Sequence, residues 1–276
     1  MIEYKMFKPQ GVLAQFVRFF WTLEAHVSLG DGPFVHRALP DNCVELIFYC
    51  KGSLSISSLD GDEGNTFPSG IFGQAQKFRQ FKTNHDFNLF GVYIYPYTLN
   101  VLLNVPSSSV CNEKIDSDTL WGRSGKVLEE QIMLAKSFAQ RIQIVSDFLL
   151  QKINKSSSYD QTFIQQIKGV VDHNTLHPIA DFADQCNLSR RQFERKFKEH
   201  SGFSPKDFFS IVRFKNVLKE AEEKRKSLAQ IAVDSGYYDQ SHFTNEFKKF
   251  SGYSPKEFFS NYPEVVDSRV RRDFKA

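Results

Sequence analysis

Polar side chains that can hydrogen-bond the edges of DNA bases recur in two short segments late in the chain, residues 190–199 and 239–250. In each segment two phenylalanines four residues apart predict a buried helix face, which leaves the polar side chains on the opposite face. Arginine can pair with guanine, glutamine and asparagine with adenine, and glutamate can accept a hydrogen bond from cytosine. The candidate base-contacting residues are Arg191, Glu194, Arg195, Gln240, Ser241, Thr244 and Asn245.

Basic and hydroxyl side chains beside these segments are candidates for contacts with DNA phosphates. Ser189 is a good N-cap for the first helix, and the free N–H groups and the dipole of a helix N-terminus attract phosphate. For a single isolated helix, a solvated face of mixed charge would be the simpler interpretation. The candidate phosphate-contacting residues are Ser189, Arg190, Lys198, His242, Lys248 and Lys249.

Both segments belong to a repeat, and the repeat favours the DNA interpretation. Residues 201–205, Ser-Gly-Phe-Ser-Pro, recur as Ser-Gly-Tyr-Ser-Pro at 251–255. Each copy predicts two short helices joined by a tight turn, which is a helix-turn-helix. The apolar stripe of residues 205–226 predicts one long helix between the copies. If both copies read one face of B-DNA, their recognition helices lie about 34 Å apart in successive major grooves.

The first half of the chain has the pattern of a β-rich domain. Short apolar runs separated by Gly, Asn and Asp turns extend from Phe34 to Tyr97, a spacing typical of a small barrel or sandwich. Helical periodicity instead marks the stretches at 13–20, 97–103, 125–135 and 137–153. We therefore expect an α+β protein, in which a β-rich domain with flanking helices precedes an all-α domain.

A polar stretch from Lys155 to Ser158 marks the expected domain boundary. The helix at 137–153 carries one apolar stripe, which packs either on its own domain or on a second copy of the chain. That stripe consists of Phe138, Ile142, Val145, Leu149 and Ile153. The expected parts are a sensor or dimerisation domain at 1–154, a linker at 155–160, a DNA-binding domain at 161–262 and a basic tail at 263–276.

Composition narrows the class of protein. The 276-residue chain has a net charge of only +3 and is 41% hydrophobic, so it can bury a core, and charge alone does not indicate a nucleic-acid partner. Its four cysteines are scattered and lack the paired spacing of a zinc site. The sequence shows neither a signal peptide nor an apolar run of about 18 residues. We expect a cytoplasmic protein with no membrane span, no catalytic residues, no metal and no cofactor.

Aromatic and polar side chains of the first half are candidates for a small-molecule pocket. The aromatic residues are most simply core, and a lone histidine is more often hydrogen-bonded or on the surface than a ligand of a metal. A pocket lined by aromatics with a few polar groups is the other interpretation. The candidate effector-pocket residues are Trp21, His36, Glu45, Phe72, Tyr93 and Tyr95.

The repeat resembles the DNA-binding domain of the AraC/XylS family of bacterial transcription regulators. The match runs from Phe163 to Tyr262 and is closest from Ala229 to Pro255, with Arg213 matching as well. Carried over position by position, the family's base-reading sites fall on the base-contacting candidates named above. Asn245 departs from the pattern, because the family often has arginine there. This departure implies that the second unit binds more weakly or prefers A·T pairs.

The first half more loosely resembles the sensor half of some of these regulators, through residues 16–21, 39–47 and 90–96. Such sensor halves are often cupin-like barrels that bind a small effector, dimerise, or do both. The resemblance implies a regulator that is not an enzyme, with double-stranded DNA, a small effector, a second copy of the chain and RNA polymerase as partners. Two alternatives stay open: a regulator whose first half only dimerises, and an enzyme fused to a DNA-binding domain.

Overall fold

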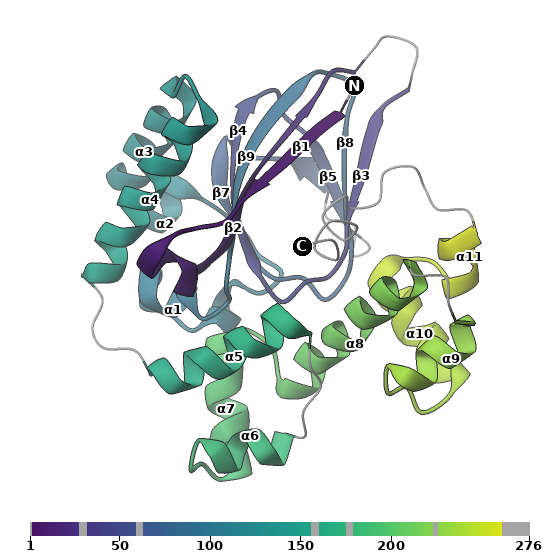
Figure 1. Ribbon diagram of the computed structural model, residues 1–276. Helices are drawn as coiled ribbons and strands as arrows, with labels where there is room; N and C mark the ends of the chain where they lie inside the picture. The colour runs from purple at the N-terminus through teal and green to yellow at the C-terminus, as the bar shows by residue number, and fades with distance from the viewer. Residues whose placement is uncertain are drawn as a thin grey trace.

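Strands come first along the chain and helices follow, so the predicted α+β class is confirmed (Figure 1). Among the residues described, none of the helices has both the length and the apolar surface that crossing a bilayer requires. Residues 156–159 of the expected linker at 155–160, and the whole of the basic tail at 263–276, lie outside the described residues. A computed structural model describes residues 2–27, 32–58, 63–155, 160–174, 179–222 and 226–260.

Two antiparallel sheets face each other in the first half of the chain (Figure 1). The larger sheet has the order β1-β2-β9-β4-β7-β10, and the smaller has the order β3-β8-β5-β6. The β-rich domain predicted from the turn spacing is therefore confirmed. The strands are β1 (Ile2–Phe7), β2 (Val17–Ala25), β3 (Phe34–Ala38), β4 (Val44–Lys51), β5 (Ser55–Ser58), β6 (Glu63–Asn65), β7 (Ser69–Phe72), β8 (Arg79–Thr83), β9 (Phe87–Ile94) and β10 (Lys114–Asp116).

Side chains alternate along the strands between a helix-facing side and an inner side. Phe90 of β9 faces outward, where its ring lies 5.5 Å from that of Phe138 on α4 (Phe138–Asn154). Its neighbour Gly91 pairs with Trp21 of β2 and lies on the inner side. A Cβ atom on Gly91 would come within 2.0 Å of the Trp21 ring, so a glycine here lets the indole lie across β9.

Helices α3 and α4 cover the outer face of the larger sheet (Figure 1). On α4, the side chains of Val145, Leu149 and Ile153 are buried against the rest of the chain. The predicted apolar stripe therefore packs on its own domain, and these three side chains are not available to a second copy. The other helices of this half are η1 (Gly11–Gln15), α1 (Thr98–Leu103), η2 (Ser107–Val110), α2 (Ser117–Trp121) and α3 (Arg123–Leu134).

The helix predicted over residues 13–20 is wrong beyond Gln15. A short 3-10 helix ends there, and strand β2 begins at Val17. Phe19 faces Tyr93 across the sheet pair, while Phe20 and Trp21 are also buried. A strand buried on both faces reads as a continuous apolar run, and such a run can imitate the helical spacing of apolar residues.

The second half consists of helices arranged around α8 (Pro205–Glu222). Phe208 near the start of α8 packs against Phe197, with ring centroids 5.1 Å apart. Phe214, further along α8, packs against Phe247 at 5.1 Å. One continuous helix therefore belongs to the core of both repeats, as the sequence predicted. The remaining helices are α5 (Gln161–His173), α6 (Ile179–Gln185), α7 (Arg190–Ser201), α9 (Leu228–Asp234), α10 (Gln240–Ser251) and α11 (Pro255–Ser260).

Candidate nucleic-acid interface

The first recognition helix, α7, begins with a capping box. The Ser189 hydroxyl accepts a hydrogen bond from the backbone N–H of Gln192, and the Gln192 side chain accepts one from the backbone N–H of Ser189 at 3.0 Å. The predicted N-cap at Ser189 is confirmed. Phe193 and Phe197 are buried, each about 1% exposed, so the helix presents its polar face to solvent.

Arginine side chains dominate the exposed face of α7. Arg190 donates to Glu194 at 3.0 Å, and the Arg195 Nε lies 4.0 Å from Glu199. Arg191 is exposed, and the Arg195 side chain is 76% exposed. Ion pairs this exposed contribute only about 0–1 kcal/mol, so these arginines can exchange their carboxylate partners for DNA at little cost.

The second recognition helix, α10, is capped by Asp239, whose carboxylate accepts a hydrogen bond from the backbone N–H of His242 at 2.7 Å. Phe243 and Phe247 are buried on its inner face. Six of the candidate DNA contacts on α10 are exposed and Thr244 is half-buried. The exposed ones are Gln240, Ser241, His242, Asn245, Lys248 and Lys249, with His242 also lying 3.7 Å from Glu246.

An ion pair that is largely buried ties α10 to α8. Arg213 of α8 donates to Glu246 of α10 at 3.3 Å, with only 20% and 15% of the two side chains exposed. Burial, and then the charge of Glu246, raise the pKa of the neighbouring Tyr237 phenol. The sequence pointed to Arg213 but not to Glu246, because a glutamate on a mixed-charge helix gives no local signal of a partner 33 residues away.

The two exposed helix faces stand at equivalent positions of a repeated fold, and residues 182–261 match the family model described as a helix-turn-helix domain. The chain carries an AraC-type helix-turn-helix domain. Residues 5–116 match a second family model, described as "Domain of unknown function (DUF6597)". The AraC-type domain thus accounts for the repeat, and the match to the second family model covers most of the β-rich domain.

Two curated relatives match a part of the chain. An uncharacterised HTH-type transcriptional regulator of Haemophilus influenzae is 32% identical over 65 residues, which is 24% of this chain and 22% of the relative. The HTH-type transcriptional activator RhaS of Pectobacterium carotovorum is 25% identical over 91 residues, 32% of this chain and 33% of the relative. The chain therefore spans between a fifth and a third of the length of these relatives, and both are regulators by name.

Among solved structures, ToxT from Vibrio cholerae aligns with 94% of this chain and 97% of its own, at 12% identity and a TM-score of 0.44.

Within the described ranges, no three or more His, Cys, Asp or Glu side chains are grouped to hold a metal ion. The four cysteines are free thiols.

The effector-pocket candidates lie in more than one place. A small apolar pocket, partly open to solvent, is lined by Trp21, His36 and Glu45 together with Tyr4, Tyr49 and other apolar residues. A second small pocket, which is more polar, is lined by Phe72, Tyr93 and Arg79, and it shares Glu45 with the first. Tyr95 points instead to the junction with the AraC-type domain, where its hydroxyl donates to Asp172 at 2.5 Å.

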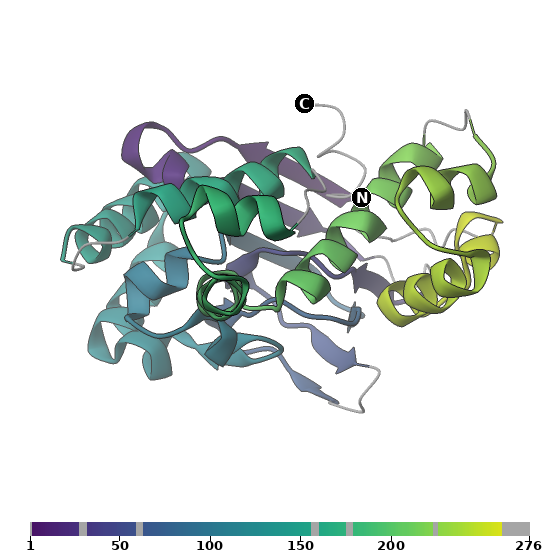
Figure 2. The same cartoon turned by 90° about the horizontal axis from the view of Figure 1, so that it is seen from below.

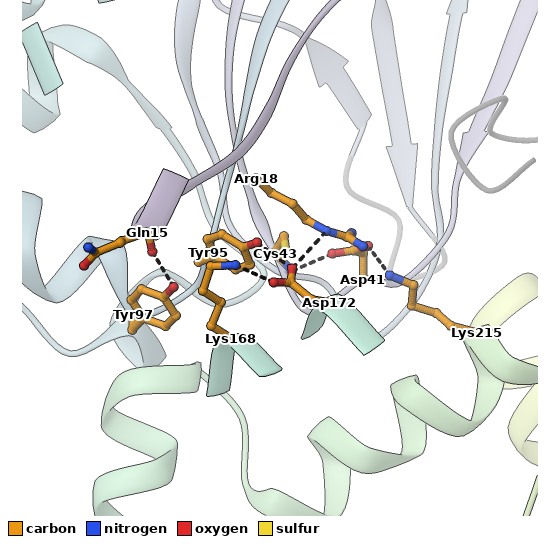
Figure 3. A network of polar contacts seen from close by, with 9 residues as sticks. All are labelled: Gln15, Arg18, Asp41, Cys43, Tyr95, Tyr97, Lys168, Asp172 and Lys215. Atoms are coloured by element: carbon orange, nitrogen blue, oxygen red, sulfur yellow. Dashed lines mark hydrogen bonds and ion pairs between the residues drawn. The ribbon is translucent and has the colours of Figure 1, made fainter. Parts of the chain in front are cut away.

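A network of charged and phenolic side chains joins the β-rich domain to the AraC-type domain (Figure 3). Lys215 of α8 donates to Asp41 at 3.1 Å, with 10% and 20% of these side chains exposed. Asp172 of α5 also lies 3.9 Å from Arg18 of β2. Burial alone would raise the pKa of Asp41, but the charges of Lys215 and Arg18 outweigh it and hold that pKa well below its usual range. The junction is therefore an ionic contact between the two domains.

Proposed function

We propose that this protein is a transcription regulator that binds DNA sequence-specifically, with α7 and α10 reading two successive major grooves. The observation that carries the proposal is the repeat itself: two capped helices present polar, exposed faces at equivalent positions of the AraC-type domain. A solvated surface helix would not need this arrangement twice. Acting on DNA, such a regulator works in the cytoplasm, and RNA polymerase is the natural partner for a change in transcription.

Selection of bound duplexes from a random DNA pool tests this proposal. The full chain should enrich two short boxes whose centres lie about one helical turn apart, because the two helices enter neighbouring major grooves. Recovery of sequences with no common motif would contradict sequence-specific binding.

Arg195→Ala is expected to relax the preference at one base pair and to weaken binding to the selected site by about 1–3 kcal/mol. Arginine at a base edge supplies a bidentate contact that other bases cannot satisfy. Fluorescence anisotropy on the selected site and on single-base variants of it measures both effects. Arg123→Ala, on the exposed start of α3, is the matched control. If Arg195→Ala weakened random and selected DNA alike, the base-reading role of Arg195 would be wrong.

Lys248→Ala is expected to weaken binding to all DNA sequences about equally. An exposed lysine at a phosphate releases a counterion on binding, so its loss should lower the slope of log affinity against log salt by about 1. Titrations across a salt series, with selected and random duplexes, measure this slope. A loss confined to the selected sequence would assign Lys248 to base recognition instead.

We further propose that a small effector binds in the apolar pocket of the β-rich domain. Aromatic walls around two polar groups, His36 and Glu45, are what small-molecule sites usually present. A thermal-shift screen of metabolites tests this, because a ligand that binds the folded state raises its melting temperature. If no metabolite raises it, a regulator whose first half only dimerises becomes the better account.

A homodimer is also part of the proposal, through the outer face of α3 and α4. The buried stripe of α4 is excluded, but an open groove between these helices is lined by Val127, Ile144 and Phe148. Leu134 at the end of α3 is 79% exposed, and such apolar exposure is typical of a surface that a partner covers. Sedimentation of the purified chain over a range of concentrations decides between monomer and dimer.

A further inference from the structure

The small apolar pocket of the β-rich domain lies between the two sheets. Trp21 of β2 and Glu45 of β4 reach it from the larger sheet, and His36 of β3 and Phe81 of β8 reach it from the smaller one. Seen from below, α5 and α8 lie in front of the strands (Figure 2), so the AraC-type domain covers one end of the β-rich domain. The described residues that line the pocket all belong to the β-rich domain, so the pocket is a site of that domain alone.

Aromatic rings line several sides of this pocket. Their side chains are buried, with between 3% and 8% of each residue exposed. The ring centroids of Tyr4 and Trp21 lie 6.0 Å apart, and those of His36 and Phe81 lie 6.2 Å apart. The face of an aromatic ring carries partial negative charge and attracts cations. The five aromatic residues of the wall are Tyr4, Trp21, Phe34, Tyr49 and Phe81.

Gly91 of β9 allows the Trp21 ring to reach the side of the pocket on which Glu45 lies. Gly91 pairs with Trp21 of β2 on one side and with Ile47 of β4 on the other. A Cβ atom on Gly91 would lie 2.0 Å from the indole Cε2 and 2.4 Å from its Nε1, so the indole extends over β9 toward β4. Glu45 is the next residue of β4 on the same face as Ile47. The indole and the carboxylate therefore enter the pocket from neighbouring positions.

Glu45 gives the pocket its negative charge. None of the described lining residues is a lysine or an arginine. Arg79 lines the second, more polar pocket, where it donates to the Gly73 carbonyl at 3.1 Å and lies 5.8 Å from the Phe72 ring. Glu45 borders both pockets. A carboxylate has about four lone-pair sites, so it can accept a ligand in one pocket while it keeps its contacts within the protein.

We propose that the effector of this pocket is a small organic cation, whose methylated ammonium group lies against the Trp21 ring and its aromatic neighbours with Glu45 as the counter-charge. Aromatic cages are the usual recognition sites of such groups. An anionic effector would be repelled by Glu45, and a lysine or arginine to bind it is absent from the described wall. This inference names the chemical class of the proposed effector, and it rests on the proposed effector site.

Three compounds of nearly equal size and shape test the preference for positive charge: tetramethylammonium, which is a cation, tert-butanol, which is neutral, and pivalate, which is an anion. Isothermal titration calorimetry of the full chain measures their affinities at constant ionic strength. The titrations are made at about pH 8, where a histidine of ordinary pKa is neutral, so that His36 adds no positive charge. Tetramethylammonium is expected to bind roughly tenfold more tightly than tert-butanol. Pivalate should bind more weakly than either, because like charges repel.

Glu45→Gln keeps the size of the side chain and removes its charge. The variant is expected to lower the affinity for tetramethylammonium roughly tenfold and to leave the affinity for tert-butanol unchanged. Glu24→Gln is the matched control, because the Glu24 side chain is 43% exposed and lies on the opposite face of β2 from Trp21. This control should bind both compounds as the wild type does.

Trp21→Phe tests the ring if Glu45→Gln proves unstable. Phenylalanine attracts cations less strongly than tryptophan, so the preference for tetramethylammonium over tert-butanol should fall although an aromatic ring remains. A circular dichroism melting curve of each variant shows whether it is folded.

Equal binding of tetramethylammonium and tert-butanol by the wild type would overturn the inference, and so would tighter binding of pivalate or no binding of any of the three. An unchanged preference for the cation in folded Glu45→Gln would refute the role of Glu45 as the counter-charge. These outcomes differ from failure of the regulator proposal. A chain that binds tetramethylammonium but selects no DNA sequence retains the cation site and refutes the regulator proposal. A chain that selects DNA boxes but shows no preference for the cation does the reverse.

Discussion

Replacing Phe247 with alanine is expected to lower the free energy of unfolding by about 3–5 kcal/mol. The ring is fully buried, and it contacts the rings of Phe214, Phe243 and Phe258 at 5.1, 5.7 and 5.3 Å. Its removal leaves a cavity where α8, α10 and α11 meet. Urea unfolding followed by helical circular dichroism measures the change.

Two controls separate this cavity effect from a general loss of surface. Phe247→Leu keeps most of the buried volume and should cost less than about half as much. Leu134→Ala, at a site that is 79% exposed, should change the free energy of unfolding by no more than about 0.5 kcal/mol. Phe247→Ala should also bind a duplex that carries both selected boxes no better than a duplex that carries only one of them. Wild-type stability in Phe247→Ala would mean that this cluster is not the core of the second unit.

Replacing Asp41 with alanine is expected to destabilise the folded chain by about 3–5 kcal/mol. The variant leaves the ammonium group of Lys215 at the domain junction without the carboxylate that lies 3.1 Å away, and this lysine side chain is only 10% exposed. The backbone N–H of Cys43 also loses its bond to the Asp41 carboxylate. Asp118→Ala, which breaks an exposed pair with Lys126, should destabilise the chain far less, because solvent screens exposed pairs. Equal losses in the two variants would contradict a special role for the junction.

The contribution of Asp41 should also depend on pH. Its pKa in the folded chain is depressed by Lys215 and Arg18 against the opposing effect of burial, whereas the unfolded value is about 3.9. A depressed folded pKa gives stability that is fully present above the unfolded pKa and is lost as pH falls toward the folded one. The difference in unfolding free energy between wild type and Asp41→Ala should therefore shrink as pH is lowered from about 5 to 3. A difference that stayed constant over this range would place the effect elsewhere.

Local patterns explain why the helical half could be predicted from the sequence. Helix α7 follows from the N-cap at Ser189 and the spacing of Phe193 and Phe197, and each of these signals lies within one or two helical turns. The repeat at Phe243 and Phe247 strengthened the prediction, because the same pattern occurring twice is unlikely to be chance. The exposed faces of both helices followed directly from these buried pairs.

Long-range contacts explain what the sequence could not predict. Strand β2 imitates the helical spacing of apolar residues up to Phe20, because both of its faces are buried and its apolar residues show no alternation. The junction residues were missed for another reason: Arg37 and Gln74 bind backbone carbonyls 214 and 127 residues away. Every residue has the same backbone carbonyl, so the residue types in the sequence do not indicate such a contact.

The turn after α7 and the turn after α10 both contact the β-rich domain, so the chain and these two contacts together form a closed loop. Starting from the β-rich domain, the path passes through Ser201 into α7, along α8 to α10, and back through Ser251 to Arg37. In a closed loop, opening one contact leaves the parts connected through the others, including the ion pair of Lys215 with Asp41. The effects of substitutions at Gln74 and Arg37 on the free energy of unfolding should therefore be non-additive. A movement of the β-rich domain would displace both recognition helices together.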